Sequence, residues 1–158
     1  MPVINFLKTS YQSLINAGNF LQSPLLLVVR IFWGALFYFA GMGKLSNIDS
    51  TISFFQSLGI PFPEFNTYLV AWVETVGGLC LMAGFASRLV AIPLIITMVV
   101  AFLTVHSDAL HGFMSNPSGV FKESPFTYLF ATLLIFIFGP GMLSVDALIE
   151  RLFGNSKK

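Results

Sequence analysis

Two ionisable residues, Arg30 and Glu74, interrupt apolar stretches that are each long enough to cross a lipid bilayer. Charged groups at membrane depth are costly, and those that persist usually face a protein interior and take part in function. The chemistry they offer is binding of a quinone or a small anion, or proton transfer at Glu74. The competing interpretation is a buried ion pair that only fixes helix register. Depth along the helices places Glu74 midway between Arg30 and Lys44, so both cations remain open as its partner.

Helical periodicity predicts that these charges lie on faces that also carry glycine. Glycine on a charged face allows a neighbouring helix to approach closely, which is typical of a packing face rather than a lipid face. The three predicted stripes are Arg30, Gly34, Phe37, Gly41 and Lys44; Glu74, Gly77, Gly78 and Leu81; and Arg88, Ile92, Ile95, Val99, Phe102 and His106. We expect the stripes to converge on one interior, although Lys44 and Arg88 also suit interfacial positions at helix ends.

A second polar group gathers around His106 and Glu123, with Asp108 and His111 nearby in sequence. Their spacing matches no established metal-ligand pattern, so we expect ordinary loop polarity and no metal site. A haem with two histidine ligands is disfavoured because both histidines lie at one end of one helix. The chain has 18 Phe, and some could line an apolar quinone slot anchored by His106 or Glu74.

The composition excludes several classes of protein. Hydrophobic residues make up 56% of the chain and charged residues 9%, against about 25% in soluble domains. The formal net charge of +1 lacks the basic excess that nucleic-acid binding requires. The one cysteine, Cys80, excludes an intrachain disulfide, a CxxC pair and a cysteine-based cluster. We therefore expect an integral membrane protein that contains no redox centre of its own.

The elements that must position these residues are four membrane-spanning helices, so the predicted fold is an all-α four-helix transmembrane bundle. A polar segment at each end flanks the bundle: residues 1–23 have helical apolar spacing and predict an amphipathic interfacial helix, and residues 147–158 form a tail. A further interfacial helix is expected at 48–58. The predicted domain covers 24–146, with spans at 25–45, 68–86, 89–106 and 126–143.

The distribution of cations predicts the orientation, because short loops on the cytoplasmic side carry an excess of Lys and Arg. An even number of spans places both termini on one side, together with Lys8, Arg88, Arg151, Lys157 and Lys158. Lys44 and Lys122 fall on the other side. Both termini are therefore predicted to be cytoplasmic.

From about Leu25 to Asp146 the chain resembles the DoxX family of membrane proteins. The resemblance depends on several short motifs in order: Arg30 with Gly34, Gly41-x-Gly43-Lys44-Leu45, Gly59-Ile60-Pro61, Glu74-x-x-Gly77-Gly78, Gly84-Phe85-Ala86-Ser87-Arg88, Met98 through Ala101 to His106, Glu123-Ser124-Pro125, and Gly139-Pro140-Gly141-Met142-Leu143-Ser144-Val145-Asp146. Met142 departs from the family, which usually has a basic residue there, and Ser87 stands where Thr is frequent.

This resemblance implies a bacterial inner membrane protein associated with quinone- or thiol-linked oxidation. Without a cysteine pair, we expect an accessory membrane subunit of a redox assembly rather than a self-sufficient enzyme. A small-molecule carrier that uses Glu74, and a non-catalytic scaffold, are the alternatives. The expected partners are the lipid bilayer, redox proteins, a quinone or small anion, and a second copy of the chain. The predicted polar site comprises Arg30, Lys44, Glu74, Arg88, His106 and Glu123.

Overall fold

The protein is an all-α bundle, as the apolar periodicity predicted. The computed structural model describes residues 2–153, and this part of the chain contains helices and no strand. The long helices are α1 (Pro2–Ser46), α3 (Pro63–Ala83), α4 (Ser87–Thr104) and α7 (Ser124–Phe138). The short helices are α2 (Ile48–Ser57), α5 (Ser107–His111), α6 (Pro117–Lys122) and α8 (Val145–Phe153).

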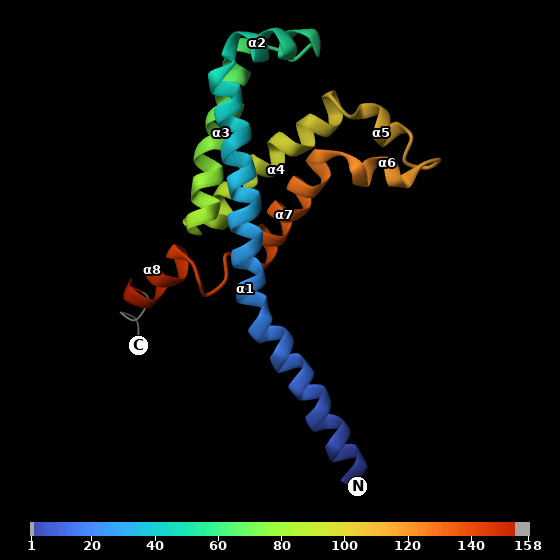
Figure 1. Ribbon diagram of the computed structural model, residues 1–158, viewed down its shortest axis with the longest axis vertical. Coiled ribbons are helices and arrows are strands. Elements are labelled where there is room, and N and C mark those ends of the chain that lie inside the picture. Colours follow the sequence, from blue (N-terminus) through green and yellow to red (C-terminus); the bar gives the residue numbers. More distant parts are fainter. Residues whose placement is uncertain (1, 154–158) are drawn as a thin grey trace.

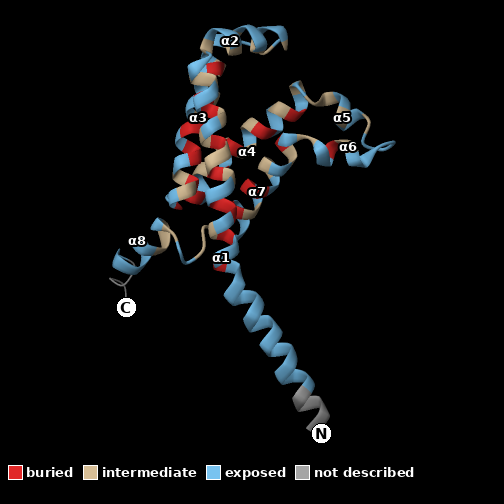
Figure 2. Cartoon of the chain, viewed as in Figure 1, coloured by how far each residue is buried: buried red, intermediate tan, exposed pale blue. Residues whose placement is uncertain are grey.

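Helices α1 and α3 lie side by side in opposite directions and form the closest pair in the bundle (Figure 1). Glycines allow this contact: a Cβ on Gly34 would lie 2.8 Å from the carbonyl oxygen of Gly78, and one on Gly41 would overlap Thr75. The predicted stripes on these two helices are confirmed as inward faces, because their members are buried apart from the partly exposed Lys44 (Figure 2). The glycines therefore mark a packing seam.

Helices α4 and α7 pack together and complete the core against α1 and α3. The core includes Phe37, Leu81, Leu94 and Ile135, and the ring of Phe37 meets Tyr128 edge-on with 4.8 Å between centroids. The third predicted stripe is wrong except at Phe102. The buried face of α4 instead comprises Ser87, Ala91, Leu94, Met98 and Phe102. Because α4 is apolar on every side, its sequence contains no contrast that could indicate the inward face.

Three helices within residues 2–153 are long and apolar enough to cross a membrane: the part of α1 from Leu7 to Ser46, α3 and α4. Helix α7 is equally apolar but has 15 residues, about 22 Å at 1.5 Å per residue. It ends at Phe138, five residues before the predicted end of the fourth span. Gly139 and Gly141 both have a φ of +79°, which stops the helix and turns the chain.

The break expected between an interfacial helix over 1–23 and the first span is not found, because α1 continues through Pro24. Proline removes one hydrogen-bond donor, and here its ring lies on an exposed side of the helix, where no neighbour is displaced. Residues 7–22 are exposed and extend away from the bundle (Figures 1 and 2). Contact between this segment and a lipid surface stays a prediction.

The short helices lie at the two ends of the bundle. Helices α2, α5 and α6 lie at one end, and α8 lies at the other, on the same side as the start of α1 (Figure 1). Helix α2 confirms the helix expected at 48–58, whereas α6 occupies what was expected to be loop. The side of the membrane that each end faces remains a prediction from the cation distribution.

Candidate functional site

A cavity of about 680 Å³ lies toward the end of the bundle that carries α2, and we call it the distal cavity. Side chains from α2, α3, α4, α7 and the end of α1 form its mainly apolar walls. The polar side chains among its lining residues are Lys44, Asn66, Glu74, Thr97, Thr104, His106, Ser124 and Tyr128. Apolar walls with a few polar groups are typical of a site for a small organic molecule.

Lys44 and Glu74 form an ion pair on the wall of this cavity, with Lys44 Nζ donating a hydrogen bond to Glu74 Oε2. Glu74 is 3% exposed, so its carboxylate depends on this partner. A helical side chain leans toward the start of its own helix. Because α1 and α3 are antiparallel, Lys44 and Glu74 lean toward each other. The partner that the sequence left open is therefore Lys44.

A second pair forms between His106 Nδ1 and Glu123 Oε2, which are 2.6 Å apart. His106 follows α4 and lines the cavity, and Glu123 directly precedes α7, so the contact joins the ends of two helices. Both side chains are partly exposed. The pair carries charge on both members when His106 is protonated.

Among the residues that the structure describes, no three His, Cys, Asp or Glu side chains gather closely enough to hold a metal ion. Asp108 and His111 are both exposed. The polar groups of this end are thus organised as two pairs.

Arg30 and Arg88 lie apart from the distal cavity. Arg30 is fully buried, and its Nη2 donates a hydrogen bond of 2.5 Å to the carbonyl oxygen of Leu143. Its side chain leans toward the start of α1, away from Glu74, so the interpretation of Arg30 and Glu74 as a pair is wrong. Gly84 leaves room for the guanidinium, which a Cβ there would overlap. The six predicted residues therefore do not converge on one interior, because Arg30 and Arg88 have separate partners away from the distal cavity.

Asp146, in the first turn of α8, connects α8 to the turn between α3 and α4. Its two carboxylate oxygens accept hydrogen bonds from the backbone N–H groups of Ala86, at 2.7 Å, and Ser87, at 3.0 Å. Its own N–H donates to the carbonyl oxygen of Gly84. A carboxylate beside the first turn of a helix satisfies N–H groups that have no acceptor within the helix. Asp146 thus acts as the cap of α4 from a distant part of the chain.

Asp146→Ala should lower the free energy of unfolding by about 1–2 kcal/mol, because both N–H groups lose their acceptor. Thermal unfolding in detergent can be followed by labelling Cys80 with a thiol-reactive dye, since it is the chain's one cysteine. The matched control is Asp49→Ala: Asp49 lies in the first turn of α2 and is exposed, so we expect a change of at most about 0.5 kcal/mol. Equal losses in the two variants would contradict the capping role.

Asn66, Pro93, Thr97 and Tyr128 are among the cavity residues that were not predicted from the sequence. Pro93 lies inside the apolar helix α4 and removes one backbone hydrogen bond from it. A proline within a predicted span is visible in the sequence and could have drawn attention to this position. Tyr128 and Thr97 are also polar residues inside predicted spans. Nothing in the sequence indicates that they face the same space as Glu74, because that depends on how α4 and α7 rotate against α3.

The geometry allows this site to hold a flat, weakly polar molecule. The walls are mainly apolar, and the ammonium of Lys44 can donate hydrogen bonds beyond its bond to Glu74. The carboxyl group of Glu74 and the imidazole of His106 can each hold or release a proton. Donors and proton carriers therefore line one apolar space.

Comparisons with known proteins agree with this architecture. The family model described as DoxX matches residues 25–107. The "Putative oxidoreductase CatD" of Bacillus subtilis is 29% identical over 125 residues, covering 79% of this chain and 87% of that protein. The "Inner membrane protein YqjF" of Escherichia coli is 34% identical over 126 residues, covering 79% and 92%. The "Inner membrane protein YphA" of the same organism is 28% identical over 123 residues, covering 77% and 88%. No solved structure matches the chain significantly.

Proposed function

The chain belongs to the DoxX family of bacterial inner membrane proteins, and from this premise we propose that it is the quinone-binding membrane subunit of a redox assembly. The distal cavity is the observation that carries the proposal. It combines apolar walls with the buried pair of Lys44 and Glu74 and with His106 at its rim. The name of the similar protein "Putative oxidoreductase CatD" supports the same class of function.

The cavity suits a quinone ring in size and in polarity. Small-molecule sites commonly enclose about 300–1,000 Å³, and the distal cavity has about 680 Å³. The carbonyl oxygens of a quinone accept hydrogen bonds, which Lys44 and the hydroxyl group of Tyr128 can donate. The flat ring matches walls that include Phe54, Phe55 and Pro93. The size of the distal cavity and its mainly apolar lining favour a quinone over a fully charged small anion.

Reduction of a quinone to a quinol consumes two electrons and two protons. In this proposal the electrons come from a partner protein, because the chain has a single cysteine and no cysteine pair to supply them. The ion pair of Lys44 and Glu74 supplies one proton, from the ammonium, and a protonated His106 supplies the other, while Glu123 orients the imidazole from outside. The subunit therefore binds, orients and protonates, and the partner carries out electron transfer.

Ala101→Trp should reduce quinone binding at least about tenfold, since the indole would fill space that the ring needs. Ala101 lines the cavity on α4. The matched control is Val99→Trp on the exposed side of the same helix, and we expect its affinity to stay within about twofold. The measurement is retention of menaquinone and ubiquinone by purified protein in nanodiscs, quantified by mass spectrometry.

Equal quinone retention in both tryptophan variants, or no retention by the unmodified protein, would count against the quinone site. The carrier hypothesis would then become the stronger one, since an ion pair at membrane depth on a cavity wall also suits proton-coupled transport. In that case Glu74→Gln should abolish solute uptake into proteoliposomes. The exposed Glu64→Gln on the same helix is its control.

A further inference from the structure

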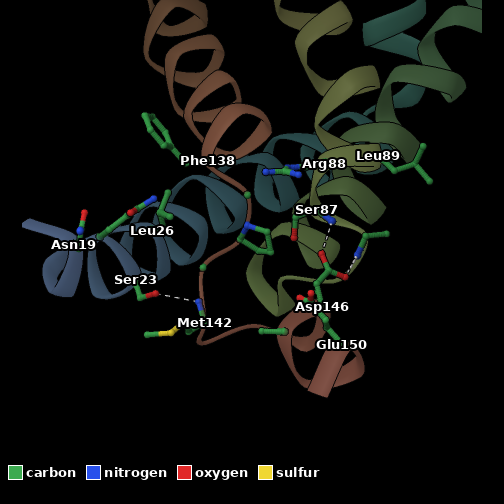
Figure 3. A pocket seen from close by; sticks show the side chains of 16 residues that line it. Asn19, Ser23, Leu26, Ser87, Arg88, Leu89, Phe138, Met142, Asp146 and Glu150 are labelled. Carbon is green, nitrogen blue, oxygen red and sulfur yellow. Dashed lines mark hydrogen bonds between the residues drawn. The ribbon is translucent and has the colours of Figure 1, made fainter. Parts of the chain in front are cut away.

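A second cavity, which we call the terminal-side pocket, lies at the end of the bundle opposite the distal cavity and has a volume of about 610 Å³. It is formed by α1, the turn between α3 and α4, the segment 138–142 and the start of α8 (Figure 3). Its polar lining comprises Asn19, Gln22, Ser23, Ser87, Arg88, Asp146 and Glu150. The proposed quinone chemistry makes no use of this pocket, so its polar lining needs a separate explanation.

The floor of the pocket is fixed by the segment after α7. The N–H of Met142 donates a hydrogen bond of 3.0 Å to Ser23 Oγ on α1. Arg88 Nη2 donates one of 3.3 Å to the carbonyl oxygen of Ile137, which holds the guanidinium beside Gly139. A Cβ on Gly139 would lie 3.3 Å from Arg88 Nη2. The pocket is therefore built by specific contacts rather than left by loose packing.

Ser87 forms part of the base of the pocket. It is fully buried, lines the pocket, and its hydroxyl group has no hydrogen-bond partner among the residues that the structure describes. Leaving a buried hydroxyl unpaired costs free energy. The backbone N–H of the same residue is already bonded to Asp146. Because its hydroxyl oxygen is closed off from solvent, Ser87 shapes the base of the pocket, and the exposed guanidinium of Arg88 is the donor that a ligand can reach.

The charges of the pocket have both signs and occupy different parts of it. Figure 3 shows the Arg88 guanidinium beside the loop that follows Phe138, whereas Asp146 and Glu150 lie on the side of α8. Asp146 is committed to two backbone N–H groups, which leaves Glu150 as the exposed anion. One cation and two carboxylates disfavour a purely anionic ligand. They suit a ligand that carries one negative and one positive group.

Large exposed apolar side chains stand beside these charges. Leu89 is 70% exposed and Phe138 is 54% exposed, and both line the pocket. In a membrane protein such side chains contact lipid chains. The pocket thus has a polar surface with positive and negative charges next to an apolar surface. A phospholipid has the matching arrangement, with a charged head group next to its acyl chains.

We propose that the terminal-side pocket binds a phospholipid whose head group carries both a phosphate and a primary ammonium, the chemistry of phosphatidylethanolamine. Arg88 binds the phosphate, because a guanidinium donates several N–H bonds in a fixed plane. Glu150 accepts from the ammonium, which has three N–H donors. A quaternary trimethylammonium has no such donor, and a glycerol head group has no positive charge. The site therefore selects among phospholipids by the chemistry of their head groups. This proposal does not depend on quinone binding in the distal cavity.

The test is native mass spectrometry of the full chain, titrated with phosphatidylethanolamine, phosphatidylcholine and phosphatidylglycerol that share the same acyl chains. We expect phosphatidylethanolamine to bind about fivefold more tightly than either of the others. Glu150→Gln should abolish that preference, and Arg88→Gln should weaken binding of all three lipids. Arg151→Gln and Glu64→Gln, at positions outside the pocket lining, should retain the preference.

Equal affinity for the three lipids, or an unchanged preference in Glu150→Gln, would overturn the proposal. Thermal unfolding of each variant, followed at Cys80, checks that the pocket is intact, and Glu150 is exposed enough that we expect no loss of stability. Soluble phosphoethanolamine forms the last arm of the experiment. If phosphoethanolamine binds as tightly as the lipid, the assignment to a membrane lipid is overturned. If phosphoethanolamine does not bind at concentrations at which the lipid saturates the site, the assignment is supported.

Discussion

Glu74→Leu should lower the free energy of unfolding by about 3–5 kcal/mol, because it leaves the ammonium of Lys44 without its anion on the wall of an apolar cavity. A buried charge that loses its partner keeps its desolvation cost and gains nothing in return. Lys44 is only partly buried, with 26% of its side chain exposed, so the loss should fall in the lower half of this range. Unfolding in detergent, followed by labelling of Cys80, measures it.

The double variant Lys44→Met with Glu74→Leu separates the ion pair from the packing around it. Replacing a whole buried pair by apolar side chains of similar volume is often neutral or stabilising, so we expect stability within about 1 kcal/mol of the original. Quinone retention by this folded double variant should still fall, since the donor and the proton carrier are gone. A double variant as unstable as Glu74→Leu would contradict this account of the pair.

Gly41→Ala should destabilise the seam between α1 and α3 by about 2–3 kcal/mol. A Cβ at position 41 would lie 2.5 Å from the backbone nitrogen of Thr75 and 2.7 Å from the carbonyl oxygen of Ala71. Backbone atoms within a helix cannot move aside as a flexible side chain can, so the two helices must separate. This loss exceeds the gain of about 1 kcal/mol in helix propensity that alanine brings over glycine.

Gly43→Ala is the matched control, because it lies two residues further along the same helix and a Cβ there would meet nothing within 4 Å. We expect this variant to be as stable as the original or slightly more stable, since only the propensity changes. The measurement is again unfolding followed at Cys80, with the same detergent for both variants. Equal effects at the two glycines would show that close approach of α1 and α3 is not what stabilises the bundle.

The sequence by itself determined the class of fold and the inward faces of α1 and α3. Apolar runs near the length of a bilayer crossing leave a helix as the main solution, because no water is present to satisfy the backbone. Arg30, Gly41 and Glu74 contrast with their apolar neighbours, and this contrast identifies the buried side of each helix. The same pattern indicated that Glu74 is buried, which the structure confirms.

The tertiary structure alone decided which charges meet. Depth along a helix could not distinguish Arg30 from Lys44 as the partner of Glu74, because the direction in which a side chain leans matters only once the neighbouring helix is placed. The antiparallel arrangement of α1 and α3 then brings Lys44 to Glu74 and turns Arg30 toward Leu143. Two sites at opposite ends replace the single interior that the stripes predicted.

The inward face of α4 and the role of Asp146 were also beyond the sequence. An evenly apolar helix has no preferred side until neighbours select one, so Ser87 and Leu94 became buried where periodicity had favoured Arg88 and Ile95. Asp146 caps a helix that starts some 60 residues earlier in the chain. Local patterns report the environment of one helix at a time, whereas cavities and caps arise from contacts between distant segments that only the folded chain brings together.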